Sequence, residues 1–120
     1  GPGGTNIITG LNSAYIEGTP IFIVSGQVFR NQRMKKHNVR QYGLQESNIL
    51  DLTKPVTKKA KSLETVDSLP QVLDELYEEM TSGRMGPVLL DIPVDIIKGF
   101  LVIASLFNKA KWLFSKEAIL

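Results

Sequence analysis

The run Pro20-Ile21-Phe22-Ile23-Val24-Ser25-Gly26 is apolar, rich in β-branched residues, and bounded by proline and glycine. Runs of this kind predict strands that are buried on both faces, as the strands of parallel sheets are. A second such run, Pro87-Val88-Leu89-Leu90-Asp91-Ile92-Pro93, lies further along the chain. Helical patterns precede and separate the two runs. The sequence therefore predicts an α/β fold with a mainly parallel sheet and helices on both faces.

The helical pattern before the first run covers residues 5–16. We expect Thr5 to cap this helix and Gly18 to end it. Gly10 lies inside it at a cost of about 1 kcal/mol relative to alanine, which indicates close packing at that position. After the first run, residues 29–45 are polar and basic without a clear period, and we expect a long loop there.

Three further patterns lie between this loop and the second run. Residues 46–53 predict a short helix, and residues 57–64 predict a short strand. Residues 67–80 predict the clearest helix, in which Ser68 and Gln71 have the spacing of a capping box. One apolar stripe runs along this helix: Leu69, Val72, Leu73, Leu76, Tyr77 and Met80.

Composition limits the classes of function. The 120 residues have room for one small domain, and 42% apolar and 22% charged residues are ordinary globular values. A net charge of +2 is too weak to argue for a nucleic-acid partner. There is no cysteine and one histidine, so neither a cysteine nor a multi-histidine metal site is predicted. The first residues lack a signal-peptide pattern, and we expect a cytoplasmic protein.

The end of the sequence differs from the rest. Residues 100–107 are apolar, and Lys109, Lys111 and Trp112 follow them. This stretch is shorter than the roughly 20 residues that cross a bilayer. We favour a helix packed on the sheet and expect no membrane association, while an interfacial membrane helix stays open as the alternative. We therefore treat residues 98–120 as a divergent apolar and basic C-terminal helix.

The corner Gly1-Pro2-Gly3-Gly4-Thr5-Asn6 is a candidate ligand wall. Glycine lets the backbone approach a ligand closely, and proline fixes the shape of a turn. The helix behind the corner directs its first free N–H groups back at it. Such a corner normally follows a strand, so we expect the chain to be an interior piece of a larger protein.

Four segments in this order resemble one family. They are the Gly1–Asn6 corner with its helix, Ser25-Gly26-Gln27-Val28, Leu44-Gln45-Glu46, and Gly86-Pro87-Val88-Leu89-Leu90-Asp91-Ile92-Pro93. Together they look like the pyrimidine-binding domain of thiamine-diphosphate enzymes of the acetolactate synthase type. The run from Val39 to Glu46 is similar to the variant in synthase-like proteins of bacterial polysaccharide pathways. The resemblance covers residues 1–97 and implies a partial doubly wound parallel sheet, with the N-terminal strands of the fold missing.

The resemblance also implies a mechanism. In such enzymes the cofactor lies between two chains of a dimer, and this domain holds the aminopyrimidine end of thiamine diphosphate. A different domain of the partner subunit holds the diphosphate and its Mg²⁺. A glutamate promotes the imino form of the pyrimidine, which takes the proton from the thiazolium carbon. The resulting ylide attacks a 2-oxo acid such as pyruvate, and some of these enzymes also contain FAD.

The resemblance assigns roles to particular residues. Those expected to contact the cofactor are Gly1, Pro2, Gly3, Asn6 and Gln27. Gln45 matches a glutamine that reaches toward the reacting carbon and a second substrate, and is the candidate catalytic residue. Lys58 matches a lysine close to the flavin site of the synthases. Without the resemblance, Gln27 and Gln45 would be ordinary polar residues of loops.

Two signatures of the family have no match in this chain. The activating glutamate precedes the corner in the family, and a Gly-Asp-Gly signature for metal and diphosphate is absent. We therefore expect this chain alone to be inactive in 2-oxo acid decarboxylation or carboligation, and to pair with a second copy or with the missing domains. The alternatives are a non-catalytic dimerisation or interaction module, with or without a membrane-touching tail, and a flavodoxin-like nucleotide binder.

Three further residues have plainer interpretations. His37 lies among basic residues, and we expect a solvated loop histidine. Glu46 is expected to be a charge at a helix N-terminus. Asp91 lies in the middle of a buried run, and we expect it to cap a neighbouring helix or turn.

Overall fold

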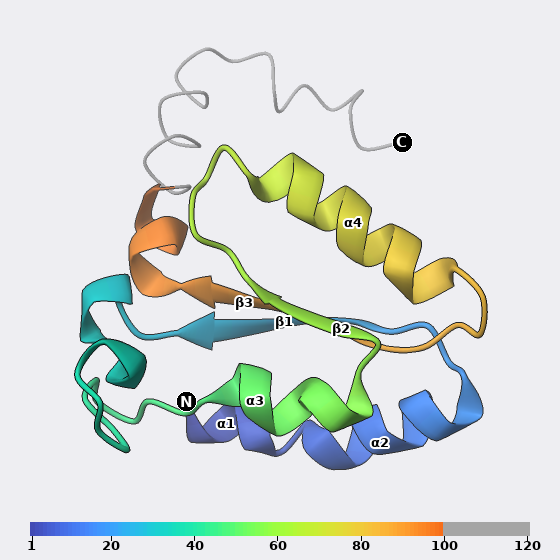
Figure 1. The fold of residues 1–120 in the computed structure, drawn as a ribbon, viewed down its shortest axis with the longest axis horizontal. Coiled ribbons are helices and arrows are strands. Elements are labelled where there is room, and N and C mark those ends of the chain that lie inside the picture. Colours follow the sequence, from blue (N-terminus) through green and yellow to red (C-terminus); the bar gives the residue numbers. More distant parts are fainter. Residues whose placement is uncertain (100–120) are drawn as a thin grey trace, which may run out of the picture.

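The computed structural model describes residues 1–99, which form an all-parallel sheet with helices on both faces (Figure 1). The strands are β1 (Phe22–Gln27), β2 (Lys59–Ser62) and β3 (Val88–Pro93), in the order β1-β3-β2. The predicted α/β class and the parallel sheet are confirmed. The strand predicted over residues 57–64 is shorter than expected.

The central strand β3 sets the register of the sheet. Val88 pairs with Phe22 of β1 and Lys59 of β2, and Asp91 pairs with Ser25 and Ser62 in the same way. Parallel neighbours need long crossover connections, and here these contain helices. Because helices cover both faces of β3, this strand is apolar on both sides, as its sequence predicted.

Each face of the sheet has its own apolar core. On one face, Val88 and Leu90 pack with Leu76 of helix α4 (Leu69–Thr81). On the other, Leu89 packs with Leu11 of α2 (Ile8–Glu17) and Ile49 of α3 (Ile49–Thr53). Figure 1 shows α4 above the sheet and α1, α2 and α3 below it.

The N-terminal corner differs from its prediction. Residues Pro2–Thr5 form a helical turn of their own, α1, because proline favours the first position of a helix. Thr5 does not cap the following helix; its hydroxyl donates to the carbonyl of Pro2, 2.6 Å away. Helix α2 begins at Ile8 and ends, as predicted, at Gly18, which has a φ of 74°.

The two later helices lie close to their predicted ranges, but α3 begins three residues later than expected. Helix α3 begins at Ile49, and Asn48 caps it by accepting from the N–H of Asp51. The expected capping box of α4 does not form. Ser68 already has a helical backbone conformation, so its hydroxyl donates back to the carbonyl of Thr65 instead of accepting from the helix.

The long loop after β1 contains two short 3₁₀ turns, η1 (Arg30–Gln32) and η2 (Met34–Lys36), and a third, η3 (Lys54–Val56), follows α3. Residues 94–99 after β3 are helical. Most of the predicted C-terminal helix, residues 98–120, lies outside the described residues. Within residues 1–99, none of the helices has the length and apolar character needed to cross a membrane.

Candidate functional site

Polar side chains gather on one face of the sheet where its strands end. On the face that α2 and α3 cover, an apolar row of Ile23, Leu89 and Ala60 crosses the three strands. The next row toward the carboxyl ends is polar: Ser25, Asp91 and Ser62. Open α/β sheets bind ligands at this end of their strands, so the row marks the functional edge.

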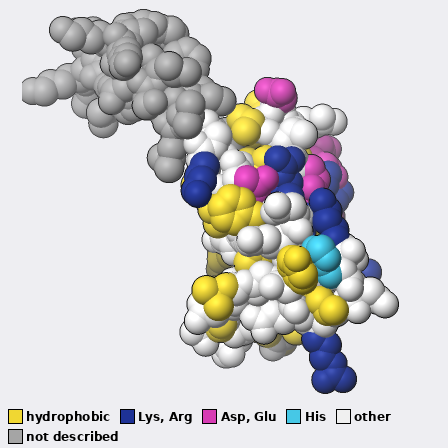
Figure 2. Space-filling view, turned by 90° about the vertical axis from the view of Figure 1, so that its left-hand side faces the viewer, with side chains coloured by type: hydrophobic (Ala, Val, Ile, Leu, Met, Phe, Trp, Pro, Cys, Tyr) yellow, Lys and Arg dark blue, Asp and Glu magenta, His cyan; other side chains and the backbone are white. Residues whose placement is uncertain are grey.

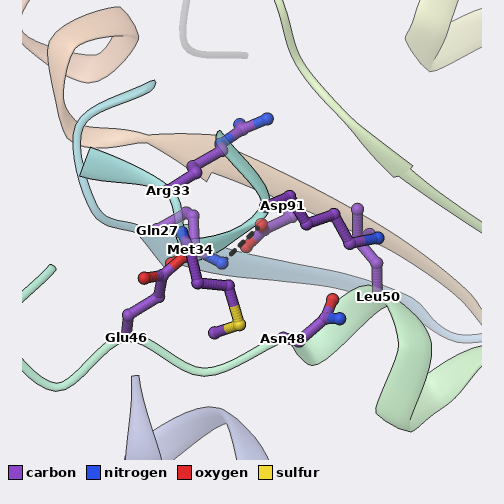
Figure 3. Close-up of a pocket in the computed structure, with 8 residues that line it drawn as sticks. Gln27, Arg33, Met34, Glu46, Asn48, Leu50 and Asp91 are labelled. Carbon is purple, nitrogen blue, oxygen red and sulfur yellow. Dashed lines mark hydrogen bonds between the residues drawn. The ribbon is translucent and has the colours of Figure 1, made fainter. Parts of the chain in front are cut away.

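Asp91 lies at the centre of the polar row, with 1% of its surface exposed. Its Oδ1 accepts from the hydroxyl of Ser25 at 2.6 Å, and its Oδ2 accepts from Nε2 of Gln27 at 3.1 Å (Figure 3). Burial raises the pKa of the Asp91 carboxyl, and these two hydrogen bonds oppose the rise. The expectation that Asp91 caps a helix or turn is wrong, because its acceptors face the neighbouring strand.

Gln27 ends β1, and its side-chain amide is hydrogen-bonded inside the chain at both its nitrogen and its oxygen. Besides Asp91, its Nε2 donates to the carbonyl of Ser47 at 3.0 Å, and its Oε1 accepts from the N–H of Val28 at 3.0 Å. The residue is 8% exposed. Gln27 therefore fastens the loop to the sheet, and its contact with a cofactor stays a prediction.

A cavity of about 50 Å³ lies beside Asp91 (Figure 3). Arg33 lines it and donates from its terminal nitrogens to Oε1 of Glu64 at 2.8 Å and to the hydroxyl of Ser62 at 2.6 Å. In the described part of the chain, Nε of Arg33 is the one buried side-chain nitrogen or oxygen without a hydrogen-bond partner.

Glu46 closes the loop on itself. Its Oε1 accepts from the N–H of Met34 at 2.7 Å, and its Oε2 accepts from those of Tyr42 and Gly43, each at 3.2 Å. The expectation of a charge at a helix N-terminus is wrong, because α3 begins only at Ile49. The loop N–H groups have no strand or helix partner, and the carboxylate supplies their acceptor.

A second fastening joins the loop to the segment after β3. Arg30 donates from Nε to Oδ2 of Asp95 at 2.6 Å and from its backbone N–H to Oδ1 at 3.3 Å. Burial alone would raise the pKa of Asp95, but the bonds from Arg30 hold it below its usual value. These partners were not found from the sequence, because a basic loop and a distant aspartate give no sign of their pairing.

The predicted corner forms the wall of a larger cavity of about 250 Å³. Its lining joins the corner to the end of β1 and to two helices: Gly1, Gly3, Gly4, Ile7, Ile23, Val24, Ser25, Gly26 and Ile49. Apart from Ser25, the lining consists of glycine backbone and aliphatic side chains. A side chain at Gly1 would place its Cβ 2.5 Å from the carbonyl oxygen of Gln45, so glycine is required there.

Of the residues predicted to form the site, Gln45 packs against the corner, whereas Pro2 and Asn6 do not line the cavity. Gln45 is exposed, packs its backbone against Gly1, and has a φ of 53° that favours glycine. Gly3 lines the cavity with Gly1. Pro2 and Asn6 are exposed and do not line it. The roles predicted for all of these residues stay predictions.

Basic side chains surround another cavity beside β2, of about 380 Å³. Lys58 lies there and donates to the carbonyl of Ser82 at 2.6 Å, while Lys35 pairs with Asp51 at 3.2 Å. Figure 2, which views the face where the strands end, shows basic side chains along one side and the histidine among them. That residue, His37, is exposed as predicted and stacks on Tyr42, with ring centroids 3.5 Å apart.

Acidic residues do not cluster into a metal site. Among residues 1–99, no group of three or more histidine, cysteine, aspartate or glutamate side chains is placed to hold a metal ion. In the sequence, only Asp91 indicated the polar row, because it is a carboxylate inside an otherwise apolar strand. Ser25 and Ser62 gave no signal, because serine is common at strand ends.

An open parallel sheet with a glycine-walled cavity at its strand ends places the chain among open α/β proteins, a class whose ligands generally bind at that edge. Three relatives make the class specific. The chain is 35% identical over 101 residues to the mitochondrial acetolactate synthase catalytic subunit of Aspergillus candidus, covering 84% of this chain and 14% of that protein. It is 35% identical to the chloroplastic acetolactate synthase of Arabidopsis thaliana, over 80% of this chain and 13% of that protein.

The third relative is the large subunit of acetolactate synthase isozyme 3 of Escherichia coli, 35% identical over 81% of this chain and 16% of that protein. No protein-family model matches the chain. The chain spans about one seventh of the length of these relatives. The resemblance seen in the motifs is confirmed: the chain is an acetolactate synthase-like segment.

Proposed function

We propose that this chain forms the pyrimidine-facing wall of a thiamine-diphosphate site in an enzyme of the acetolactate synthase type. One observation carries the proposal: the Gly1–Gly4 corner lines a cavity at the carboxyl end of β1, with Gln45 packed against Gly1. The chain is also similar over 84% of its length to an acetolactate synthase catalytic subunit, and the sequence motifs of that resemblance include the corner and Gln45.

The cavity suits a flat heteroaromatic ring. Its corner wall has no side chains at Gly1 and Gly3, and Ile7 and Ile49 supply aliphatic surface for the faces of a ring. When bound, thiamine diphosphate supplies the carbanion chemistry that acts on a 2-oxo acid. The residues of this chain hold the ring, exclude water from it, and present Gln45 at the exposed rim for a second substrate.

The site needs a further protein component. No carboxylate is among the described residues that line this cavity, so this wall has no acid to place a proton on the pyrimidine. Leu44, beside Gln45, is 88% exposed, and Tyr42 is 56% exposed. Exposed apolar side chains in the loop that meets the corner support completion by a second copy or by other domains of the enzyme. The chain alone should therefore not consume pyruvate.

Two matched glycine variants test the proposal. Gly3 and Gly10 both lie in helices, and a Cβ at either would meet no atom within 4 Å, but only Gly3 lines the cavity. Thiamine diphosphate titrated at millimolar concentration should shift the amide NMR signals of Gly4 and Gly26 in the wild type and in G10L. In G3L the leucine fills the ring site, and these shifts should be lost.

The proposal fails if G3L and G10L respond alike, or if the shifts fall on the lysine-lined cavity beside β2.

The exposed Leu44 and Tyr42 also favour the second candidate, a non-catalytic interaction module. A module of that kind would self-associate on size exclusion without responding to thiamine diphosphate, and G3L would leave its association unchanged.

A further inference from the structure

Gln45 has a backbone conformation that its own side chain opposes. Among residues 1–99, two non-glycine residues have a positive φ, namely Asn38 at 51° and Gln45 at 53°. Asparagine adopts the left-handed region readily, whereas glutamine incurs a steric cost there. Such a conformation persists only where its surroundings impose it, and it is typical of functional sites. The contacts around Gln45 must therefore hold it.

The turn that contains Gln45 is fixed at its start. The backbone N–H of Glu46 donates to the carbonyl of Gly43 at 3.2 Å, which makes Gln45 the third residue of a four-residue turn. A positive φ at that position is typical of type II turns and normally belongs to glycine. Gly43 packs on Val28, whose Cγ1 lies 2.8 Å from where a Cβ at Gly43 would be. The Glu46 carboxylate accepts from the N–H groups of Gly43 and Tyr42, so the turn begins in a fixed place.

The other end of the turn is held by Gln27 and Asp91 (Figure 3). The carbonyl of Ser47, two residues after Gln45, accepts from Nε2 of Gln27 at 3.0 Å and from the N–H of Ile49 at 2.9 Å. The same Nε2 donates to Oδ2 of Asp91 at 3.1 Å. An ionised carboxylate only accepts hydrogen bonds, so Asp91 selects the orientation of the Gln27 amide that presents its nitrogen to the Ser47 carbonyl.

We propose that Asp91 and Gln27 are positioning residues that hold Gln45 in its left-handed conformation. Gln27 acts through its bond to Ser47, and Asp91 acts through Gln27. The sign of φ decides on which side of the turn the side chain of Gln45 leaves the backbone. The inference rests on the proposed function for the role of Gln45 at the rim of the cavity, but the contacts that carry it need no ligand.

A conservative variant of Gln27 in the full 120-residue chain tests the positioning. Q27E keeps an oxygen to accept from the N–H of Val28, but it loses the donor to Ser47 and Asp91. A positive φ brings the amide hydrogen of a residue close to its own Hα. The wild-type chain should therefore show a strong nuclear Overhauser effect between these two atoms of Gln45, and Q27E should lose it.

Two controls accompany this measurement. Asn38 is the internal reference, because its residue type favours a positive φ, and it should keep its own amide-to-Hα effect in Q27E. Q71E makes the same chemical change at an exposed position of α4 and should leave the effect at Gln45 intact. Loss of the effect at Asn38 together with Gln45 would show a general loosening of the loop and would overturn the proposal.

The double variant D91N/Q27E separates positioning from stability, and it decides the question even if Q27E alone does not fold. An asparagine amide at position 91 donates to the new carboxylate, so the midpoint of urea unfolding, which falls in Q27E, should recover. The Ser47 carbonyl still lacks its donor from residue 27, so the effect at Gln45 should stay lost. A strong effect at Gln45 in Q27E or in the double variant would overturn the proposal.

These measurements are independent of the proposed function, because they are made without thiamine diphosphate. A wild-type chain whose Gly4 and Gly26 signals do not shift in the titration would refute the thiamine-diphosphate site. The amide-to-Hα effects at Gln45 would still decide whether Asp91 and Gln27 impose its conformation.

Discussion

Asp91 is the residue on which the polar edge of the sheet depends. It is buried, accepts from Ser25 and Gln27, and lies in register with Ser62 on the other neighbouring strand. Through Gln27 it also reaches the carbonyl of Ser47 in the loop. A single carboxylate therefore links β3 to β1 and, through Gln27, to the loop at Ser47.

The titration of Asp91 should be visible in the stability of the protein. Burial raises its folded-state pKa above the ordinary 3.8, so its stabilising contribution is fully present below 3.8 and is lost as the pH rises through the folded pKa. In D91N an amide N–H faces Gln27, which lowers stability by about 1 kcal/mol at low pH. The deficit of D91N relative to wild type should shrink as the pH rises, in urea unfolding.

Asp74 is exposed, and D74N serves as the control for removing a surface carboxylate. A D91N deficit that stays constant from acid to neutral pH would show that the Asp91 carboxyl titrates normally.

Glu75 should show the opposite pH dependence. Hydrogen bonds from Lys59 and Lys61 lower the pKa of its carboxyl from 4.5 to about 2. Its contribution is therefore present above pH 4.5 and lost as the pH falls toward 2. In E75Q the difference from wild type should be small, as for surface ion pairs generally, and should vanish across that window in thermal unfolding scans. A difference that persists at pH 2 would argue against the pairing.

Among the elements, the loop from Val28 to Ser47 is held mainly by side-chain hydrogen bonds, of which the one from Gln27 to the carbonyl of Ser47 is the first. Arg30 binds Asp95, Arg33 binds Ser62 and Glu64, and Glu46 accepts from three N–H groups of the loop. The loop crosses the carboxyl ends of the strands (Figure 1). Its order therefore depends on charged side chains of the loop, two of which find their partners in distant parts of the sequence.

Removal of the Glu46 carboxylate should loosen this loop specifically. E46A leaves the N–H groups of Met34, Tyr42 and Gly43 without their acceptor and should cost about 1–3 kcal/mol. Hydrogen exchange of these three amides should rise well above the global rate. The exposed Glu78 offers the control: E78A should leave them protected, and equal exchange in both variants would refute the role of Glu46.

Two glycines of helix α2 should respond in opposite ways to alanine. Gly18 has a left-handed φ of 74°, and a Cβ there would lie 3.3 Å from the carbonyl of Met85, so G18A should lose about 1–2 kcal/mol. A Cβ at Gly10 meets nothing within 4 Å, so G10A should gain about 0.5–1 kcal/mol. Urea unfolding measures both, and a loss in G10A would contradict the open surroundings of that position.

Some of the helices and strands could be predicted from the sequence alone. The strands at Phe22–Gln27 and Val88–Pro93 and the helix at Leu69–Thr81 were predictable, because apolar runs and stripes reflect burial in the core. The close packing expected at Gly10 was wrong, since that residue is exposed. The helix caps predicted at Thr5 and Ser68 were also wrong. Each hydroxyl donates to a nearby carbonyl instead, and small changes of backbone angle decide which local partner it reaches.

For the whole molecule, the motifs named the corner and Gln45, and the structure packs the backbone of Gln45 against Gly1. The roles predicted for these residues stay predictions, and the side-chain partners around them could not be predicted. The partners of Asp91 and Arg33 come from strands and loops far apart in sequence. These pairings depend on the register of the sheet, and that register could not be predicted from the sequence alone.

The position of the bound ring would show whether the corner is a pyrimidine wall. The measurement is an intermolecular nuclear Overhauser spectrum of the ¹³C-methyl-labelled chain with thiamine diphosphate. We predict contacts from the pyrimidine methyl group to the methyl groups of Ile7, Ile23 and Ile49, which line the cavity. Contacts made only by the thiazolium ring, or only by side chains around Lys58, would contradict the account.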